Sequence, residues 1–168
     1  MNKPTTCLFS LAAVVLLTGC IPLQQAAMRG DTTKVQQLLD KGTDVNVKDF
    51  GNQTALIYAA ARGHSETVEL LLNRGADINA ANRSSETALM RASGAGHIDC
   101  VRVLLAHGAN IDQRNRHGQN ALDFARKKGH PDIVQLIAAA SRKGAAGEAA
   151  PPSVPATLSP PAESAAPF

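Results

Sequence analysis

NQTALIYAAARGHSETVELLLNRGADINAAN, residues 52–82, is followed by a second copy of the same pattern, SETALMRASGAGHIDCVRVLLAHGANIDQRN, at residues 85–115. The register between the copies is 33 residues, and it continues to both sides of them. It is kept by three sets of residues: Gly30, Gly63, Gly96 and Gly129; Leu23, Leu56, Leu89 and Leu122; and Val35, Val68, Val101 and Val134. A period of this length indicates one supersecondary unit stacked on copies of itself.

Each copy has the spacing of two short amphipathic helices. The first helix begins after Thr54, whose hydroxyl can cap it, and ends at Gly63, which can adopt the left-handed conformation. Its narrow apolar face consists of Leu56, Ala59 and Ala60, and the alanines leave room for a neighbouring helix. The second helix ends at Gly75 and has an apolar face made of Val68, Leu71 and Leu72. An exposed turn then leads to the next unit.

This pattern of T-x-L, A-A, G-H, V, L-L and G-A resembles the ankyrin repeat, and the resemblance covers roughly residues 22–140. It implies an all-α ankyrin-repeat solenoid of about four helix-turn-helix units with short exposed turns. The units would span about residues 22–48, 49–81, 82–114 and 115–140. The first unit would be a cap with a polar surface that faces solvent, because it contains Gln24, Gln25, Gln36 and Gln37.

Both ends of the chain differ from the repeats in composition. Residues 1–19 combine Lys3 with an uncharged apolar run at residues 8–17, which is typical of a secretory signal peptide. Residues 141–168 contain six of the nine prolines and are rich in alanine and serine. A segment of that composition buries too little apolar surface to fold, so we expect a disordered tail.

The signal segment closes with Leu17-Thr18-Gly19-Cys20, which resembles the lipobox of bacterial lipoproteins. The resemblance implies cleavage after Gly19, a lipidated N-terminus at residues 20–21, and acyl chains, including palmitate, on Cys20. Ile21 in place of aspartate implies an outer-membrane location facing the periplasm. The acyl chains would contribute about 0.8 kcal/mol per buried methylene, enough for stable anchoring. The alternative is an ordinary signal peptide with a chance cysteine.

The residues that could act in catalysis or metal binding lie at positions of the repeat pattern. His64, His97 and His130 each come directly after a repeat glycine, where the ankyrin pattern has histidine, so we interpret them as structural rather than as metal ligands. Cys100 lies on the apolar face of a second helix, so we interpret it as a core residue. No nucleophile–base arrangement, phosphate-binding glycine loop or metal-ligand spacing is present. The sequence therefore predicts no enzymatic activity, no cofactor and no metal.

The positions that vary between units are rich in basic residues. In ankyrin domains partners usually touch the turn tips and the inner face of the first helices. Ten of the fifteen residues that we assign to those positions are Lys or Arg. The candidate partner-binding residues are Met28, Arg29, Lys41, Lys48, Phe50, Arg62, Arg74, Arg83, Glu86, His107, Arg114, Arg116, His117, Lys127 and Lys128. The formal net charge of the whole chain is only +3. We therefore expect one positive concave face, with Phe50 as its apolar anchor.

These observations predict a non-enzymatic, monomeric protein-binding module, held by lipid in the bacterial envelope. Its basic face would bind an acidic protein, either as a scaffold for an envelope enzyme or as an immunity protein that neutralises an effector. The alternative ligand is an anionic lipid head group or lipopolysaccharide at the membrane surface. A solvated basic surface without a dedicated ligand is the third interpretation. Nucleic acid would suit the charge, but the export signal points to a compartment without it.

Overall fold

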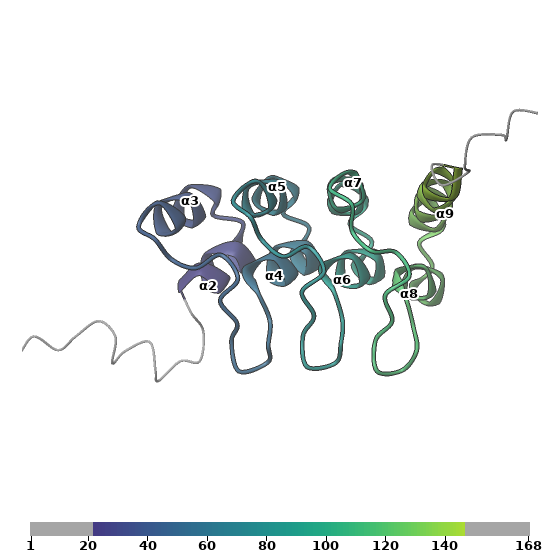
Figure 1. The fold of residues 1–168 in the computed structure, drawn as a ribbon, viewed down its shortest axis with the longest axis horizontal. Coiled ribbons are helices and arrows are strands. Elements are labelled where there is room, and N and C mark those ends of the chain that lie inside the picture. Colours follow the sequence, from purple (N-terminus) through teal and green to yellow (C-terminus); the bar gives the residue numbers. More distant parts are fainter. Residues whose placement is uncertain (1–21, 147–168) are drawn as a thin grey trace, which may run out of the picture.

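The computed structural model describes residues 22–146, which form eight helices arranged in two layers (Figure 1). We call the first helix of each unit an inner helix: α2 (Pro22–Arg29), α4 (Ala55–Arg62), α6 (Ala88–Ala95) and α8 (Ala121–Lys128). The second helices form the outer layer: α3 (Thr32–Asp40), α5 (Ser65–Asn73), α7 (Ile98–Ala106) and α9 (Pro131–Ala146). Each inner helix packs on its own outer helix, and α2, α4 and α6 each pack also on the next inner helix. The predicted helical solenoid is thus confirmed.

The inner helices begin and end where the sequence predicts. The Thr54 hydroxyl accepts a hydrogen bond from the Ile57 amide at 3.4 Å, and Thr87 does the same for Met90 at 3.3 Å. In the last unit Asn120 replaces the threonine and forms a reciprocal capping box with Asp123. Three inner helices end at a glycine in the left-handed conformation: Gly63, Gly96 and Gly129.

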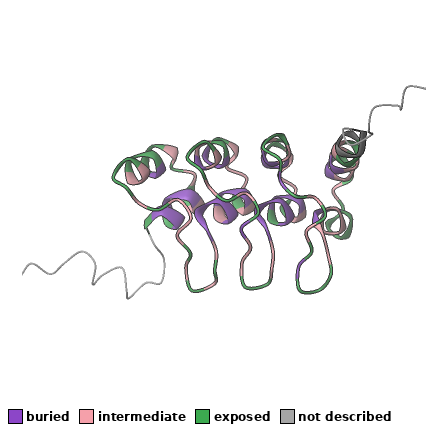
Figure 2. Ribbon diagram, in the orientation of Figure 1, coloured by how far each residue is buried: buried purple, intermediate pink, exposed green. Residues whose placement is uncertain are grey.

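The core lies between the two layers and is almost entirely aliphatic (Figure 2). The buried side chains cluster on the inner helices and on the inward faces of the outer helices, whereas the outward faces are exposed. The repeated residues Leu56, Leu89 and Val68 are fully buried, but Leu122 and Val134 of the last unit are only partly buried. The difference follows from stacking, because no further unit among the described residues covers α8 and α9.

The histidines connect successive units. A Cβ atom added to Gly63 would lie 2.6 Å from Nδ1 of His97 in the next unit, and one added to Gly30 would lie 2.5 Å from Nδ1 of His64. His64 Nε2 also lies 3.2 Å from the Met28 carbonyl oxygen. The rings therefore fill the space above the helix-ending glycines. Within the described range, no three His, Cys, Asp or Glu side chains come together in a way that could hold a metal ion.

Three loops, residues 41–54, 74–87 and 107–120, join each outer helix to the next inner helix and project from the same edge of the stack (Figure 1). We call residues 49–53, 82–86 and 115–119 the loop tips. In the second tip the Asn82 Oδ1 atom accepts hydrogen bonds from the amides of Ser84 at 2.9 Å and Glu86 at 3.0 Å. Asp49 and Asn115 do the same in their tips. The three tips thus share one backbone geometry.

Backbone hydrogen bonds also connect neighbouring tips. The Arg83 amide donates to the Gly51 carbonyl at 2.9 Å, and the Arg116 amide donates to the Ser84 carbonyl at 3.1 Å. The tips therefore form one continuous edge whose spacing is set by the main chain. Side chains at these positions are held at fixed intervals along the stack.

In its helices, the structure differs from the sequence-based predictions at two places. Gln24, expected on a solvent-facing polar cap, is fully buried, and its Nε2 donates to the Val47 carbonyl oxygen at 2.9 Å. Helix α9 continues to Ala146, past the expected boundary at residue 140, so residues 141–146 are helical where the sequence predicted the start of a tail. Residues 1–21, with the predicted signal peptide and Cys20, and residues 147–168 of the predicted tail lie outside the described range.

None of the helices between residues 22 and 146 combines the length and the apolar character that crossing a bilayer requires.

Candidate protein-binding surface

Charge is distributed unequally between the two helical layers. The inner helices contain six Lys or Arg residues and one acidic residue, Asp123. The outer helices contain four Lys or Arg residues and five acidic residues. The inner layer is therefore strongly positive, while the outer layer is close to neutral. This segregation produces a directional field on a chain of small net charge.

A shallow cavity of about 170 Å³ opens on the exposed face of the inner helices. We call it the central groove. Its lining residues come from three consecutive helices: Ala61 of α4, Arg91, Gly94 and Ala95 of α6, and Phe124 and Lys128 of α8. Small residues form the middle of the groove, whereas two cations and one aromatic ring stand around it.

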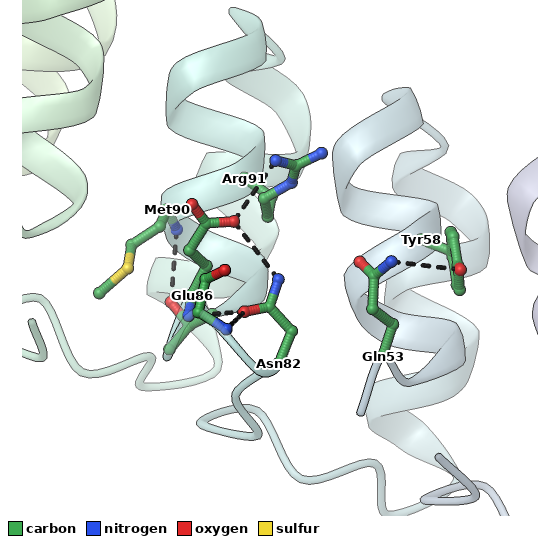
Figure 3. Close-up of polar contacts among 8 residues, drawn as sticks. Gln53, Tyr58, Asn82, Glu86, Met90 and Arg91 are labelled. Atoms are coloured by element: carbon green, nitrogen blue, oxygen red, sulfur yellow. Dashed lines mark hydrogen bonds and ion pairs between the residues drawn. The ribbon is translucent and has the colours of Figure 1, made fainter. Parts of the chain in front are cut away.

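Arg91 is held in place by a polar cluster at the base of α6 (Figure 3). Its Nη1 atom lies 3.4 Å from Glu86 Oε2, and the same carboxylate oxygen accepts a hydrogen bond from Asn82 Nδ2 at 3.3 Å. The Glu86 side chain is 17% exposed and the Arg91 side chain 44%. Glu86, a predicted partner-binding residue, therefore lies mostly beneath the surface and orients the arginine above it.

The equivalent cluster in the preceding unit has a different composition. Tyr58 takes the place of Arg91 and donates from its hydroxyl to Asp49 Oδ2 at 2.7 Å, while Gln53 Nε2 donates to the Tyr58 oxygen at 3.2 Å (Figure 3). In the last unit the position is Phe124. The inner face thus presents tyrosine, arginine and phenylalanine in succession at steps of one repeat.

Most of the predicted partner-binding residues lie at the inner layer or along the loops. Met28, Arg29, Arg62, Lys127 and Lys128 belong to inner helices. The loops contain Lys48, Phe50, Arg83, Glu86, Arg114, Arg116 and His117. Phe50, at the first loop tip, is 71% exposed and is the one exposed large hydrophobic residue between residues 22 and 146. Twelve of the fifteen candidates therefore lie on the inner helices or in the part of the loops beyond the outer-helix caps.

The other three candidates lie at the start of the loops, far from the loop tips and the inner helices. Lys41, Arg74 and His107 are the C-cap residues of the outer helices α3, α5 and α7, so their assignment to turn tips or first helices was wrong. Arg74 Nη1 also pairs with Asp40 Oδ1 at 2.8 Å, a contact between two outer helix ends. Such an exposed ion pair contributes at most about 1 kcal/mol to stability. It nevertheless occupies the side chain of Arg74, which was predicted from the sequence to bind a partner.

Sequence reasoning missed Arg91 and Phe124. Both project from the exposed side of an inner helix and line the central groove, yet neither was among the candidates. The signal that could have found them is the repeat itself, because Tyr58, Arg91 and Phe124 occupy one position at steps of 33 residues. Large side chains of unlike chemistry at one repeat position are typical of a recognition surface rather than of a core.

Cys100 is fully buried in α7, as the sequence predicts. Burial, together with the nearby Asp99 carboxylate, raises the pKa of the Cys100 thiol to about 11. We expect this thiol to stay unreactive toward a disulfide reagent at pH 8 in the folded chain and to react at once in urea. The thiol assay needs the Cys7→Ser, Cys20→Ser background, in which Cys100 is the only cysteine. Rapid reaction in the native protein would contradict the burial.

The same pKa shift predicts a pH dependence of stability. The thiol of the unfolded chain ionises near pH 9, before that of the folded chain, so ionisation favours unfolding as the pH rises from 9 to 11. Between these values, the free energy of unfolding should fall more steeply for the wild type than for Cys100→Ala. Parallel urea titrations of the two proteins at pH 8 and pH 10.5 measure this difference.

A family model described as ankyrin repeats (3 copies) matches residues 5–82 and 79–146. The two matches together include the whole range that the structure describes. A comparison with curated proteins finds no match.

Proposed function

The chain belongs to the ankyrin-repeat family, whose repeats are protein–protein interaction modules, and we propose on this premise that it is a non-enzymatic binding module for an acidic protein. The binding surface would combine the exposed side of the inner helices with the loop tips. The chain would act in the bacterial envelope, anchored by lipid, as a scaffold for an envelope enzyme or as an immunity protein that neutralises an effector.

The observation that carries this proposal is the charge difference between the layers. The inner helices contain six cations and one acid, whereas acids slightly outnumber cations in the outer helices. A positive field confined to one face attracts an acidic partner and also orients it during the encounter. The rigid stack keeps these charges at fixed intervals, which suits recognition of an extended surface.

Charge reversal on the proposed binding surface, and separately on the outer helices, tests the proposal. The inner variant combines Arg62→Glu, Arg83→Glu and Arg116→Glu, all at exposed positions of α4 and two loop tips. We expect partner recovery in a pull-down from envelope extract, quantified by mass spectrometry, to fall by tenfold or more. Attraction is lost because three fixed positive charges become negative on the face that meets the partner.

The matched control reverses three exposed cations of the outer layer, Lys34, Arg102 and Arg142, and changes the net charge by the same amount. Its partner recovery should stay within twofold of the wild type. Equal losses in both variants would mean that net charge, not the inner face, governs binding. Unchanged recovery in the inner variant would rule out the basic face as the binding surface.

The proposed anchor rests on Cys20 and on where the first helix starts. Helix α2 begins at Pro22, so a lipid on Cys20 would place the stack only two residues from the membrane. We expect Cys20→Ala to abolish incorporation of labelled palmitate and to move the protein from the membrane fraction to the soluble fraction. Cys7→Ala is the control, because it leaves the lipobox cysteine in place. Equal labelling and membrane recovery of Cys20→Ala and wild type would refute the anchor.

The same cations also favour a second candidate ligand, an anionic lipid head group or lipopolysaccharide. The two ligands differ in their response to salt. Binding of the lipid-free Cys20→Ala chain to phosphatidylglycerol vesicles should fade as ionic strength rises, because exposed charges are screened. A complex with a protein that also buries an apolar group, such as Phe50, should persist at salt concentrations that release the vesicles.

A further inference from the structure

We propose that the central groove binds one acidic and one apolar side chain that lie two positions apart, and therefore on the same face, in an extended segment of the partner protein. The carboxylate would lie between Arg91 and Lys128, and the apolar side chain would lie on Ala95 against the Phe124 ring. This inference rests on the proposed function and names the chemistry that one part of the basic face recognises.

The carboxylate position follows from the geometry of Arg91. Glu86 lies on one side of the guanidinium at 3.4 Å and is itself fixed by Asn82, so the arginine does not have to be ordered on binding. A guanidinium has five N–H donors in a planar fork, and Glu86 engages one nitrogen of this group. Donors remain available to a second carboxylate, which a guanidinium can bind through two parallel hydrogen bonds. Lys128 adds a second positive charge from the neighbouring helix α8.

The apolar position follows from the small residues beneath it. Ala61, Gly94 and Ala95 give the groove its depth, because larger side chains there would fill it. A Cβ atom added to Gly94 would lie 3.0 Å from Phe124 Cδ1, which shows how closely the ring lies over the α6 backbone. The groove therefore offers one aromatic edge and two methyl groups to an incoming aliphatic side chain.

The size of the groove favours a side chain over a small molecule. Its volume is about 170 Å³, whereas pockets for cofactors and drug-sized ligands measure about 300–1,000 Å³. Its charge also argues against a second copy of this chain placed face to face in a twofold dimer. In that arrangement the positive inner layers would oppose each other, with Asp123 as the one acidic residue of the inner helices to offset them.

A peptide-binding measurement tests the groove directly. The probe is a fluorescein-labelled peptide in which glutamate and leucine alternate at every second position with serine between them, so that both lie on one face of the extended chain. It is titrated with the full-length protein in detergent and followed by fluorescence anisotropy. We expect Ala95→Leu, which fills the groove, to weaken binding at least fivefold. Ala106→Leu is the matched control, because Ala106 is likewise the exposed last residue of a helix, α7 in the outer layer. It should leave binding within twofold.

A second pair of variants tests the charge. Arg91→Gln or Lys128→Gln should each weaken peptide binding about fivefold or more, whereas Arg102→Gln on the outer helix α7 should leave it unchanged. Two altered peptides, one with glutamine for glutamate and one with serine for leucine, should both bind more weakly than the original. These substitutions are at exposed positions, and each variant is to be checked for folding by circular dichroism.

Three results would overturn the inference: no binding of the original peptide, equal binding by Ala95→Leu and wild type, or equal affinity for the glutamate–leucine and glutamate–serine peptides. The last two would indicate attraction by charge alone. Failure here is distinguishable from failure of the proposed function, because Arg62, Arg83 and Arg116 do not line the groove. If reversal of these three charges abolishes partner recovery while Ala95→Leu does not reduce it, the basic face is supported as the binding surface and the proposed role of the groove is refuted.

Discussion

Leu104→Ala is expected to lower the free energy of unfolding by about 2–5 kcal/mol. Leu104 is fully buried in α7, within the single aliphatic core shared by both helical layers. Successive units are held in register by the histidine–glycine contacts, so we expect the cavity left by the substitution to close only in part. Urea unfolding followed by circular dichroism measures the loss, and the slope of the transition shows whether the stack still unfolds as one unit.

Leu105→Ala is the control within the same helix, because Leu105 is only partly buried. It removes the same atoms and changes helix propensity equally, but it leaves a smaller cavity. We expect its cost to be less than half that of Leu104→Ala. Equal costs would mean that helix formation, rather than burial between the layers, limits stability.

Gly63→Ala is expected to destabilise the chain much more than Gly129→Ala. Both glycines end an inner helix in the left-handed conformation, with φ of 82° and 77°. Either substitution therefore costs about 1–2 kcal/mol of backbone strain. Only at Gly63 would the new Cβ atom also lie 2.6 Å from the His97 ring, whereas no atom lies within 4 Å of it at Gly129. The forced shift of the ring should add about 1–3 kcal/mol.

A double-mutant cycle with His97→Ala separates strain from the steric clash. In the His97→Ala background, Gly63→Ala should cost no more than Gly129→Ala does in the wild type, because the ring that the methyl group strikes has been removed. The cycle is followed by urea unfolding of the four proteins. Similar costs for Gly63→Ala in both backgrounds would show that the histidine does not restrict this position.

The repeat made most of the fold predictable. Caps such as Thr54, terminators such as Gly63 and the buried leucines act within one unit or between identical neighbours, so a pattern that recurs at a fixed step specifies them. Gln24 was misplaced for the opposite reason. It takes the position of Ile57 and Met90 in the later units, and burial of that position outweighed the preference of its amide for water. A polar composition in the first unit could not reveal this.

The last helix shows what an absent terminator does. Gly42, Gly75 and Gly108 follow the outer helices of the first three units, but the corresponding residue of the last unit is Ser141. Without a glycine to adopt the left-handed conformation, and with three alanines before it, α9 continues to Ala146. The change of composition at residue 141 suggested that the helix ends there. The helix nevertheless continues, because the residues around this position favour helix formation.

The proposed binding surface was only partly predictable because its geometry arises between units. The sequence identifies exposed and variable positions, and it located the cations of the loop tips and of the ends of α2, α4 and α8. Whether a given residue reaches a groove depends on the sizes of residues one repeat away, as with Ala61 and Phe124 around Arg91. The C-cap residues Lys41, Arg74 and His107 were misassigned because turn composition does not distinguish the two ends of a loop.

The main-chain bonds from Arg83 to Gly51 and from Arg116 to Ser84 involve no side-chain atoms. The spacing of the proposed binding edge therefore does not depend on the exposed side chains along it. Exposed residues along that edge can be exchanged by evolution, or randomised in a library, while the spacing of the display positions is retained. Binders with new targets could therefore be selected from this chain by varying a few codons, without redesigning the framework.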